Sequence, residues 1–257
     1  MKAFVLAEPG KVKWFDAPEP QLVPYGAILK PVAVTPCSSD VHTVFGGGSK
    51  KQDNLVLGHE CIAEVVSVGE NVCDFKTGDR VAVPAITPDW REKSIQEGND
   101  RHASAPFSGH QLGRTQPGVF SERFLIKDAD TTLAHIPQKI SEEQALMSVD
   151  VVTTGFTGAE YADIKIGDTV CVIGIGPIGL MAVAGAKLRG AARIIAVGTR
   201  PKCVQLAKYY GATDVLSYKE GDIVQQVKEL TNGIGVDATI IAGGTAEVLT
   251  QAYDMTR

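Results

Sequence analysis

Residues 170–200 read VCVIGIGPIGLMAVAGAKLRGAARIIAVGTR, and their pattern sets the class of fold that we expect in the second half of the chain. An apolar run, Val170–Ile173, leads into a glycine-rich turn, a helical segment follows, and a second apolar run, Arg193–Val197, closes a β-α-β unit. The turn has the spacing Gly-x-Gly-x-x-Gly, which between a strand and a helix is typical of a dinucleotide site. We therefore predict a parallel α/β domain that binds a nucleotide cofactor at this turn.

Each glycine of this turn has a predicted task. Gly174 permits the tight turn, Gly176 lets the backbone approach a pyrophosphate, and Gly179 lets the helix pack on the strand. Pro177 and Ile178, at the start of the helix, complete the predicted cofactor-binding segment. The N-terminus of a helix favours the negative charge of a pyrophosphate. The alternative is an empty turn, but the flanking strands and helix favour the nucleotide site.

The end of the second apolar run points to one cofactor. A site that prefers NAD usually has an acidic residue about 20 residues after the glycines, where it accepts a hydrogen bond from the ribose 2′-hydroxyl. This chain has Gly198, Thr199 and Arg200 there instead. A glycine leaves room for an extra phosphate, Thr199 can donate a hydrogen bond to it, and the planar guanidinium of Arg200 can bind it. The pattern predicts NADP, and the alternative is an exposed arginine in a turn.

The composition excludes several classes of protein. The chain has 257 residues, of which 44% are hydrophobic and 21% are charged, as in a soluble globular protein of one or two domains. A net charge of −5 gives no footprint for nucleic acid or for an anionic membrane surface. The N-terminus lacks the apolar core of a signal peptide, and no apolar run reaches membrane-spanning length. Five cysteines without CxxC spacing indicate free thiols in a reducing compartment, so we expect the cytoplasm.

The pattern of apolar residues changes at about residue 150. Residues 1–150 contain short alternating or apolar runs broken by Gly, Pro and Asp, which predict a mostly β domain. Its predicted strands include Ala27–Val34, Glu60–Val68, Arg80–Val83 and Gly118–Leu125. Residues 151–257 alternate strands with helices, which predicts a parallel sheet. The strands expected there are Thr169–Ile173, Arg193–Val197, Asp214–Ser217 and Ala238–Ile241, and the helices lie near Gly179–Arg189, Pro201–Tyr210 and Asp222–Thr231.

Two features of this plan are unusual. Residues 88–117 predict a long loop, and loops of that length are often functional. A Rossmann sheet has six strands, whereas only four candidates precede the end of this chain, at Tyr253–Arg257 inside an expected helix. We therefore expect an incomplete doubly wound sheet in a C-terminally truncated chain, or a sheet that another chain completes.

Three residues of the first domain suggest a metal site. Cys37 follows an apolar strand, His59 begins another strand, and Asp150 comes just before the turn into a helix. Thiolate, imidazole and carboxylate make a plausible tetrahedral zinc set, and three protein ligands leave a fourth place for water or substrate, as in catalytic sites. Taken singly, each residue has another interpretation: a buried thiol, a loop histidine and a helix cap.

The spacing of these residues resembles that of a known family. The series runs Cys37-x-Ser39-x-x-His42, then Gly58-His59-Glu60, then Gly174-x-Gly176-Pro177-x-Gly179. It resembles the motif series of the zinc-dependent medium-chain alcohol dehydrogenases, and is most similar to the NADP-dependent secondary alcohol dehydrogenases of bacteria and protists. Further segments that carry the resemblance, which covers Met1–Arg257, are Val83–Trp90, Thr153–Phe156 and Val197–Arg200. That branch has an aspartate where other members place a second cysteine ligand, which fits Asp150.

The resemblance implies a fold for each half of the chain. Residues 1–150 would form a mostly β, GroES-like catalytic domain with the zinc, and residues 151–257 a truncated Rossmann domain that binds NADP. It implies one catalytic zinc, because residues 84–117 lack the cysteines that hold a structural zinc in many members. Members are usually dimers within homotetramers, paired through the last Rossmann strand, which this chain lacks.

The resemblance also implies a mechanism for the interconversion of small secondary alcohols and ketones. Zinc held by Cys37, His59 and Asp150 would bind the alcohol oxygen and lower its pKa. Ser39 would accept the alcohol proton, and His42 would carry it outward through the cofactor ribose. Hydride would pass between the alcohol carbon and the nicotinamide.

Four further residues receive expectations from the resemblance. Glu60 would lie near the metal, behind the ligands or as a ligand that exchanges with water; its alternative is a solvated carboxylate. Tyr218 would pack beside the adenosine phosphate, or is a tyrosine at the edge of the core. Ala85 and His110 fall where the family builds its substrate pocket. His110 is a departure, because close relatives have tryptophan there.

Two other functions compete with this one. A zinc-free reductase of the same superfamily would lack the Cys-His-acid set that this chain has. A truncated, non-catalytic NADP-binding or interaction protein is the second, because an incomplete sheet exposes an unpaired edge. Stoichiometric zinc with turnover would exclude the latter, whereas NADP binding without turnover would support it.

Overall fold

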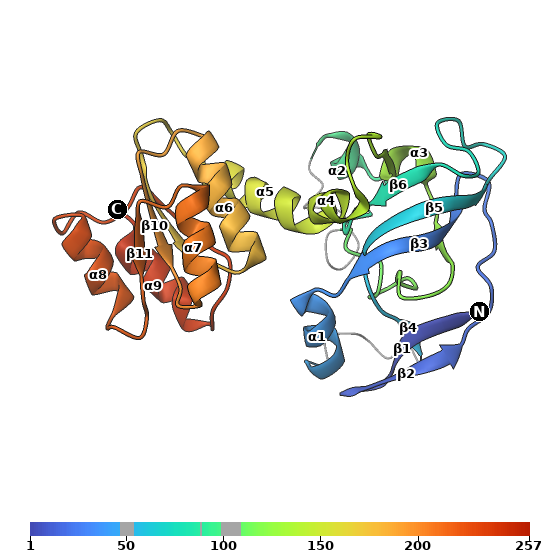
Figure 1. The fold of residues 1–257 in the computed structure, drawn as a ribbon, viewed down its shortest axis with the longest axis horizontal. Helices are drawn as coiled ribbons and strands as arrows, with labels where there is room; N and C mark the ends of the chain where they lie inside the picture. Colours follow the sequence, from blue (N-terminus) through green and yellow to red (C-terminus); the bar gives the residue numbers. More distant parts are fainter. Residues whose placement is uncertain (47–53, 88, 99–108) are drawn as a thin grey trace. The chain divides into compact units, whose positions relative to one another are not determined.

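The computed structural model describes residues 1–46, 54–87, 89–98 and 109–257 of the chain (Figure 1). The chain divides into two compact units, Met1–Asp150 and Val151–Arg257. None of the helices in these described ranges is both long and apolar enough to cross a membrane.

The first unit is built on two antiparallel sheets. The larger has the strand order β7-β3-β5-β6-β8, and the smaller has the order β2-β1-β4. The strands are β1 (Lys2–Glu8), β2 (Lys11–Asp16), β3 (Ala27–Thr35), β4 (Leu55–Val56), β5 (Glu60–Val68), β6 (Arg80–Val83), β7 (Phe124–Ile126) and β8 (Ala134–His135). Short helices accompany them: α1 (Ser38–Phe45), α2 (Lys93–Gln96), α3 (Ala129–Thr132), α4 (Glu142–Met147) and a π-helical turn η2 (Ser148–Val152). The prediction of a mostly β domain is confirmed.

The pairing of β3 with β5 sets the position of the functional residues. Thr35, the last residue of β3, pairs with Glu60, the first residue of β5. Cys37 follows β3 by two residues and His59 precedes β5 by one, so both lie at the same end of this strand pair. Inside the sheet, alternate residues of these strands, such as Leu29, Ala63 and Val65, are fully buried in the main core of the unit.

The predicted strand Gly118–Leu125 is wrong over most of its length, because β7 covers only Phe124–Ile126. Gly118 instead lies against the chain just after β4. Its N–H donates to the carbonyl of Val56 at 2.9 Å, and a Cβ on Gly118 would lie 2.3 Å from the carbonyl oxygen of Gly58. This close approach of two backbones requires glycine and turns the segment away from the sheet.

The second unit is a doubly wound parallel sheet with the strand order β11-β10-β9-β12. Its elements are α5 (Thr153–Tyr161), β9 (Thr169–Ile173), α6 (Pro177–Leu188), β10 (Arg193–Val197), α7 (Pro201–Tyr210), β11 (Asp214–Leu216), α8 (Ile223–Leu230), β12 (Ala238–Ile241) and α9 (Glu247–Met255). All four predicted strands are confirmed, three of them at the predicted bounds. The expectation that the chain ends inside a helix is wrong by two residues, because α9 ends at Met255.

Alternate residues of the central strand bury opposite faces of this sheet. Val170 and Val172 pack with α6 and α7, whereas Cys171 and Ile173 pack with α8 and α9. Strands covered on both faces read as continuous apolar runs, which is why the sequence alone located them.

Two glycines of α5 give a matched test of how tightly this helix packs on α6. A Cβ on Gly155 would lie 2.4 Å from the Cβ of Met181 and 2.7 Å from the carbonyl oxygen of Ile178. A Cβ on Gly158 would meet only Ile240, at an ordinary 3.5 Å. The first position has no space for a methyl group, and the second does.

We expect Gly155→Ala to lower the free energy of unfolding by about 1–3 kcal/mol through overpacking. Gly158→Ala should leave it unchanged or raise it by up to about 1 kcal/mol, because alanine favours helix. Urea unfolding of both variants checks this pair. Equal stability of the two variants would contradict the packing described here.

Candidate active site

Four side chains of the first unit that could bind a metal ion come together in one place. Cys37, His59, Glu60 and Asp150 each offer a ligand atom, and these atoms all lie within 4.8 Å of one another. It is the one such cluster found among the residues that the structure describes. The structure therefore brings the predicted ligands Cys37, His59 and Asp150 together with Glu60.

The local secondary structure positions the side chains of this cluster. Cys37 is the N-cap of α1, and Glu60 opens β5. Asp150 lies in η2, a widened helical turn of a kind that often occurs at functional sites. The N–H of Ala85 donates to the carbonyl of Val149 at 3.0 Å, which ties this turn to the chain after β6.

His59 lies at the centre of the cluster. Its Nε2 is 3.3 Å from the Ser39 hydroxyl, 3.7 Å from Asp150 Oδ2 and 3.8 Å from Glu60 Oε1. Its Nδ1 is 3.3 Å from Asp40 Oδ1. One ring nitrogen thus faces the donor cluster while the other is held by a carboxylate, as metal-binding histidines usually are.

Asp40 is a further residue of the site that was not predicted from the sequence. This carboxylate is buried, and besides His59 it accepts the backbone N–H of Cys37 at 2.9 Å and of Gly58 at 3.3 Å. An acidic residue three positions after an N-cap residue is the capping-box pattern, and that signal could have drawn attention to it. Asp40 connects the two segments that carry Cys37 and His59.

Burial and charge shift the pKa values of the cluster. Glu60 is 1% exposed, and burial together with the negative charges of Asp150 and Cys37 raises its pKa to about 8. Burial opposes the charge on His59, yet hydrogen bonds to Asp150 and Asp40 raise its pKa to about 11. A hydrogen bond to His59 lowers the pKa of Cys37 to about 7, against the effect of burial.

The donor set fits a zinc ion. Ligand bonds of 2.0–2.3 Å place the ligand atoms of a tetrahedral site about 3.3–3.8 Å apart. The separations from His59 Nε2 to Asp150 and Glu60 agree with that range. In addition, Glu60 Oε2 is buried without a hydrogen-bond partner among the described residues, so the site leaves a carboxyl oxygen free for a cation once Glu60 loses its proton.

A cavity of about 560 Å³ lies in the second unit, at the carboxyl ends of its parallel strands. Six of the predicted cofactor residues line it, namely Gly174, Gly176, Gly198, Thr199, Arg200 and Tyr218. Pro177, Ile178 and Gly179 belong to α6, which begins beside the cavity. Ligands of open α/β sheets bind at this end of the strands.

The glycines of the turn act differently in the structure. Gly174 has φ +90°, and a Cβ on Gly179 would lie 1.8 Å from the carbonyl oxygen of Gly174. The fold therefore requires glycine at both positions. A Cβ on Gly176 would meet only Arg200 Nη2, at 3.5 Å. Gly198 makes room for a side chain, since a Cβ there would lie 2.2 Å from Cγ1 of Ile175. The structure thus gives Gly198 a packing reason besides the predicted room for phosphate.

Polar groups gather at the end of β10. The Thr199 hydroxyl donates to the Tyr218 hydroxyl at 3.0 Å, and both side chains line the cavity. The guanidinium of Arg200 reaches toward Gly176, as the 3.5 Å approach to its Cβ position shows. A cation and two hydroxyls therefore face the space above the glycine-rich turn.

The remaining predicted residues have different surroundings. Ser39 contacts His59, and His42 is exposed on α1, three residues further along the same helix. Ala85 is buried beside η2. The ring of His110 contacts the ring of His59 edge-on, with 4.5 Å between centroids. Burial and the charge of His59 lower the pKa of His110 to about 4.

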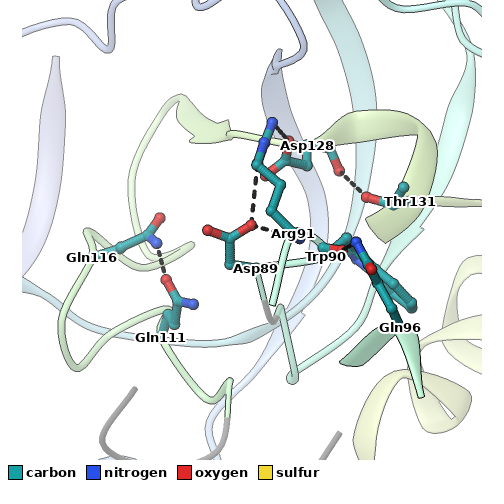
Figure 2. A network of polar contacts seen from close by, with 8 residues as sticks. All are labelled: Asp89, Trp90, Arg91, Gln96, Gln111, Gln116, Asp128 and Thr131. Atoms are coloured by element: carbon teal, nitrogen blue, oxygen red, sulfur yellow. Dashed lines mark hydrogen bonds and ion pairs between the residues drawn. The ribbon is translucent and has the colours of Figure 1, made fainter. Parts of the chain in front are cut away.

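The predicted loop 88–117 is partly outside the described residues, which omit 88 and 99–108. Its described part contains α2 and an ion-pair network (Figure 2). Arg91 pairs with Asp89 at 3.2 Å and with Asp128 at 2.7 Å, which anchors this segment to the chain after β7.

Comparison with known proteins identifies the family. The model described as alcohol dehydrogenase GroES-like domain matches residues 24–138, and the model described as zinc-binding dehydrogenase matches residues 177–257. The NADP-dependent isopropanol dehydrogenase of Thermoanaerobacter brockii is 54% identical over 100% of this chain and 73% of its own length. The protein of the same name from Clostridium beijerinckii is 52% identical with the same coverage.

The solved structures agree. Zinc dependent alcohol dehydrogenase 2 from Streptococcus pneumonia, in its apo form, matches 100% of this chain and 73% of its own with a TM-score of 0.89 and 28% identity. The chain belongs to the zinc-dependent alcohol dehydrogenases, within the medium-chain dehydrogenases/reductases. The family expected from the motif series is confirmed.

We expect Asp40→Asn to weaken zinc binding by about 10–100-fold, because an amide cannot accept all the hydrogen bonds that fix Cys37 and His59. Asp16→Asn, at an exposed carboxylate, is the control and should bind zinc like the parent chain. Competition with a chromophoric chelator measures both. Equal affinity in both variants would contradict the positioning role of Asp40.

Zinc binding should release protons. His59 and Glu60 hold protons at pH 7 in the metal-free protein, with pKa values of about 11 and 8. His59 must lose its proton to act as a ligand, and the positive charge of the ion should displace the proton of the neighbouring Glu60. Because the metal-free state binds more protons, affinity should rise with pH. Calorimetry in two buffers of different ionisation enthalpy counts the protons, and Glu60→Gln should release about one fewer than the parent chain. If the Glu60→Gln variant released as many protons as the parent chain, the second released proton would not come from Glu60.

Proposed function

We propose that this chain is an NADP-dependent zinc alcohol dehydrogenase that interconverts small secondary alcohols and ketones. The single observation that carries the proposal is the partly buried cluster of Cys37, His59, Glu60 and Asp150 in the first unit. The names of the two relatives, NADP-dependent isopropanol dehydrogenases, support the cofactor and the substrate class. In this proposal residues 1–150 are the catalytic domain, residues 151–257 bind the cofactor, and the enzyme works in the cytoplasm.

Cys37, His59 and Asp150 would hold the zinc. The approach of Nε2 of His59 to Asp150, with Nδ1 fixed by Asp40, supports this assignment. When bound, the ion supplies Lewis acidity, which lowers the pKa of an alcohol toward neutrality. Glu60 would exchange with a ligand from solvent; one of its oxygens lies 3.8 Å from His59 Nε2 and the other is unpartnered among the described residues, which supports this role.

Ser39 and His42 would move the proton. The Ser39 hydroxyl lies at the cluster, 3.3 Å from His59 Nε2, where it can accept the alcohol proton. His42 is three residues further along α1, so the two side chains are neighbours on the helix surface. Since His42 is exposed, it can pass the proton to solvent. Oxidation of one alcohol thus yields a ketone, a proton and NADPH.

The cavity of the second unit would take NADP. The pyrophosphate would lie at the glycine-rich turn and the N-terminus of α6, and the 2′-phosphate beside Thr199, Arg200 and Tyr218. The donor set at the end of β10 consists of two hydroxyls and a guanidinium, which suits a phosphate better than a ribose hydroxyl. The cofactor supplies or accepts the hydride when bound.

Oxidation of NADPH with acetone, beside NADH and with or without a zinc chelator, tests the proposal. We expect turnover that prefers NADPH and stops with the chelator. Ser39→Ala should lower kcat by about 10²–10⁴ and keep its zinc, whereas Ser38→Ala, at an exposed position of the same helix, should change little. NADP binding and one zinc per chain without turnover would favour the non-catalytic alternative instead.

The preference for NADPH over NADH should depend on Arg200. Arg200→Ala should raise the KM for NADPH by about 10–100-fold, because a hydrogen-bonded charge pair with the 2′-phosphate is lost, and leave the KM for NADH nearly unchanged. Lys208→Ala, on the last turn of the same helix α7, is the matched control. Parallel changes with both cofactors would remove Arg200 from the phosphate site.

A further inference from the structure

His110 has a feature that the proposed reaction does not use. Its Nε2 is buried and has no hydrogen-bond partner among the described residues. The side chain nevertheless lies at the site, with its ring at 60° to the ring of His59 and 4.5 Å between centroids. The backbone beside it is fixed, because the N–H of Thr87 donates to the carbonyl of Gly109 at 2.8 Å.

A buried polar atom without a partner is unfavourable. Leaving a donor or acceptor unsatisfied costs about 1–3 kcal/mol, and native proteins keep few such groups. Glu60 Oε2, also unpartnered among the described residues, has an evident use, since it faces a cation site. His110 Nε2 lies outside that donor set, so its use must come from something else that enters the site.

We propose that His110 is a specificity-determining residue whose Nε2 hydrogen-bonds a hydroxyl group on the carbon next to the reacting carbon of the substrate. The inference rests on the proposed function, which places the reacting oxygen at the cluster of Cys37, His59 and Asp150. Because the ring of His110 contacts the ring of His59, a group on the adjacent substrate carbon would lie close to it. A hydroxyl both donates and accepts, so it satisfies either tautomer of the imidazole.

The substrate class that follows is vicinal diols and α-hydroxy ketones. A site that offers a hydrogen bond to a substrate hydroxyl discriminates against the analogue that lacks it, because the polar group of the site then stays unpaired. An apolar ring at position 110 would give no such preference. The imidazole therefore shifts selection from plain ketones toward hydroxylated ones.

Acetoin and 2-butanone test this, since they differ by one hydroxyl on the carbon beside the carbonyl. We expect a kcat/KM for acetoin at least about 10-fold above that for 2-butanone with NADPH. His110→Phe keeps a ring against His59 and removes Nε2, and should lower this ratio by about 10–100-fold at unchanged zinc content. His110→Gln restores a polar atom and should keep part of the preference.

Several results would overturn the proposal: a parent chain that prefers 2-butanone, or a His110→Phe variant in which both substrates change equally. The turnover of 2-butanone itself reports the proposed function, so the two failures are distinguishable. If neither ketone turns over, NMR titrations of zinc-loaded protein with 2,3-butanediol and 2-butanol give the dissociation constants directly. Tighter binding of the diol that His110→Phe abolishes supports the proposal, and equal constants refute it.

Discussion

The buried carboxylate of Asp40 is the interaction on which the geometry of the site rests. It joins the N–H of Cys37, the N–H of Gly58 and Nδ1 of His59, which come from the end of one strand and the start of another. A buried charge is tolerated only when its hydrogen bonds are satisfied, and here three donors satisfy it. The same bonds hold the Cys37 thiol and the His59 ring in place in the metal-free protein. These two side chains therefore become ordered during folding and not on metal binding.

Electrostatics then make this preformed site a cation site. Around one imidazole lie a thiol and three carboxyl groups, those of Asp40, Glu60 and Asp150. Without a metal, the protein accommodates this excess of negative groups by keeping protons on His59 and Glu60, as the raised pKa values of both show. A divalent ion held by these residues would supply the positive charge that those protons supply in the metal-free protein.

The sequence predicts the second unit better than the first for a physical reason. Strands such as β9 and β10 are covered on both faces, so local apolar runs reveal them without tertiary information. The segment at Gly118 failed because its conformation follows from contact with Gly58, sixty residues away. Asp40 was missed for a similar reason: its bonds to Gly58 and His59 are visible only once β3 and β5 are paired. The sequence therefore reveals the candidate metal ligands through their residue types and spacing. It does not reveal Asp40, which holds two of them in position.

The glycines of the nucleotide turn show how far one motif mixes folding with binding. Gly174 and Gly179 are required by the backbone of the turn itself, and Gly198 by the side chain of Ile175. A Cβ on Gly176, in contrast, would meet only the mobile end of a long side chain, that of Arg200. The fold therefore does not explain glycine at this position, whereas a ligand that lies against the backbone, as the proposed function requires, would explain it. In the proposed function the guanidinium above it belongs to the residue assigned to the 2′-phosphate. Gly176 and Arg200 would then contact one ligand, at the position of the motif where the fold itself needs glycine least.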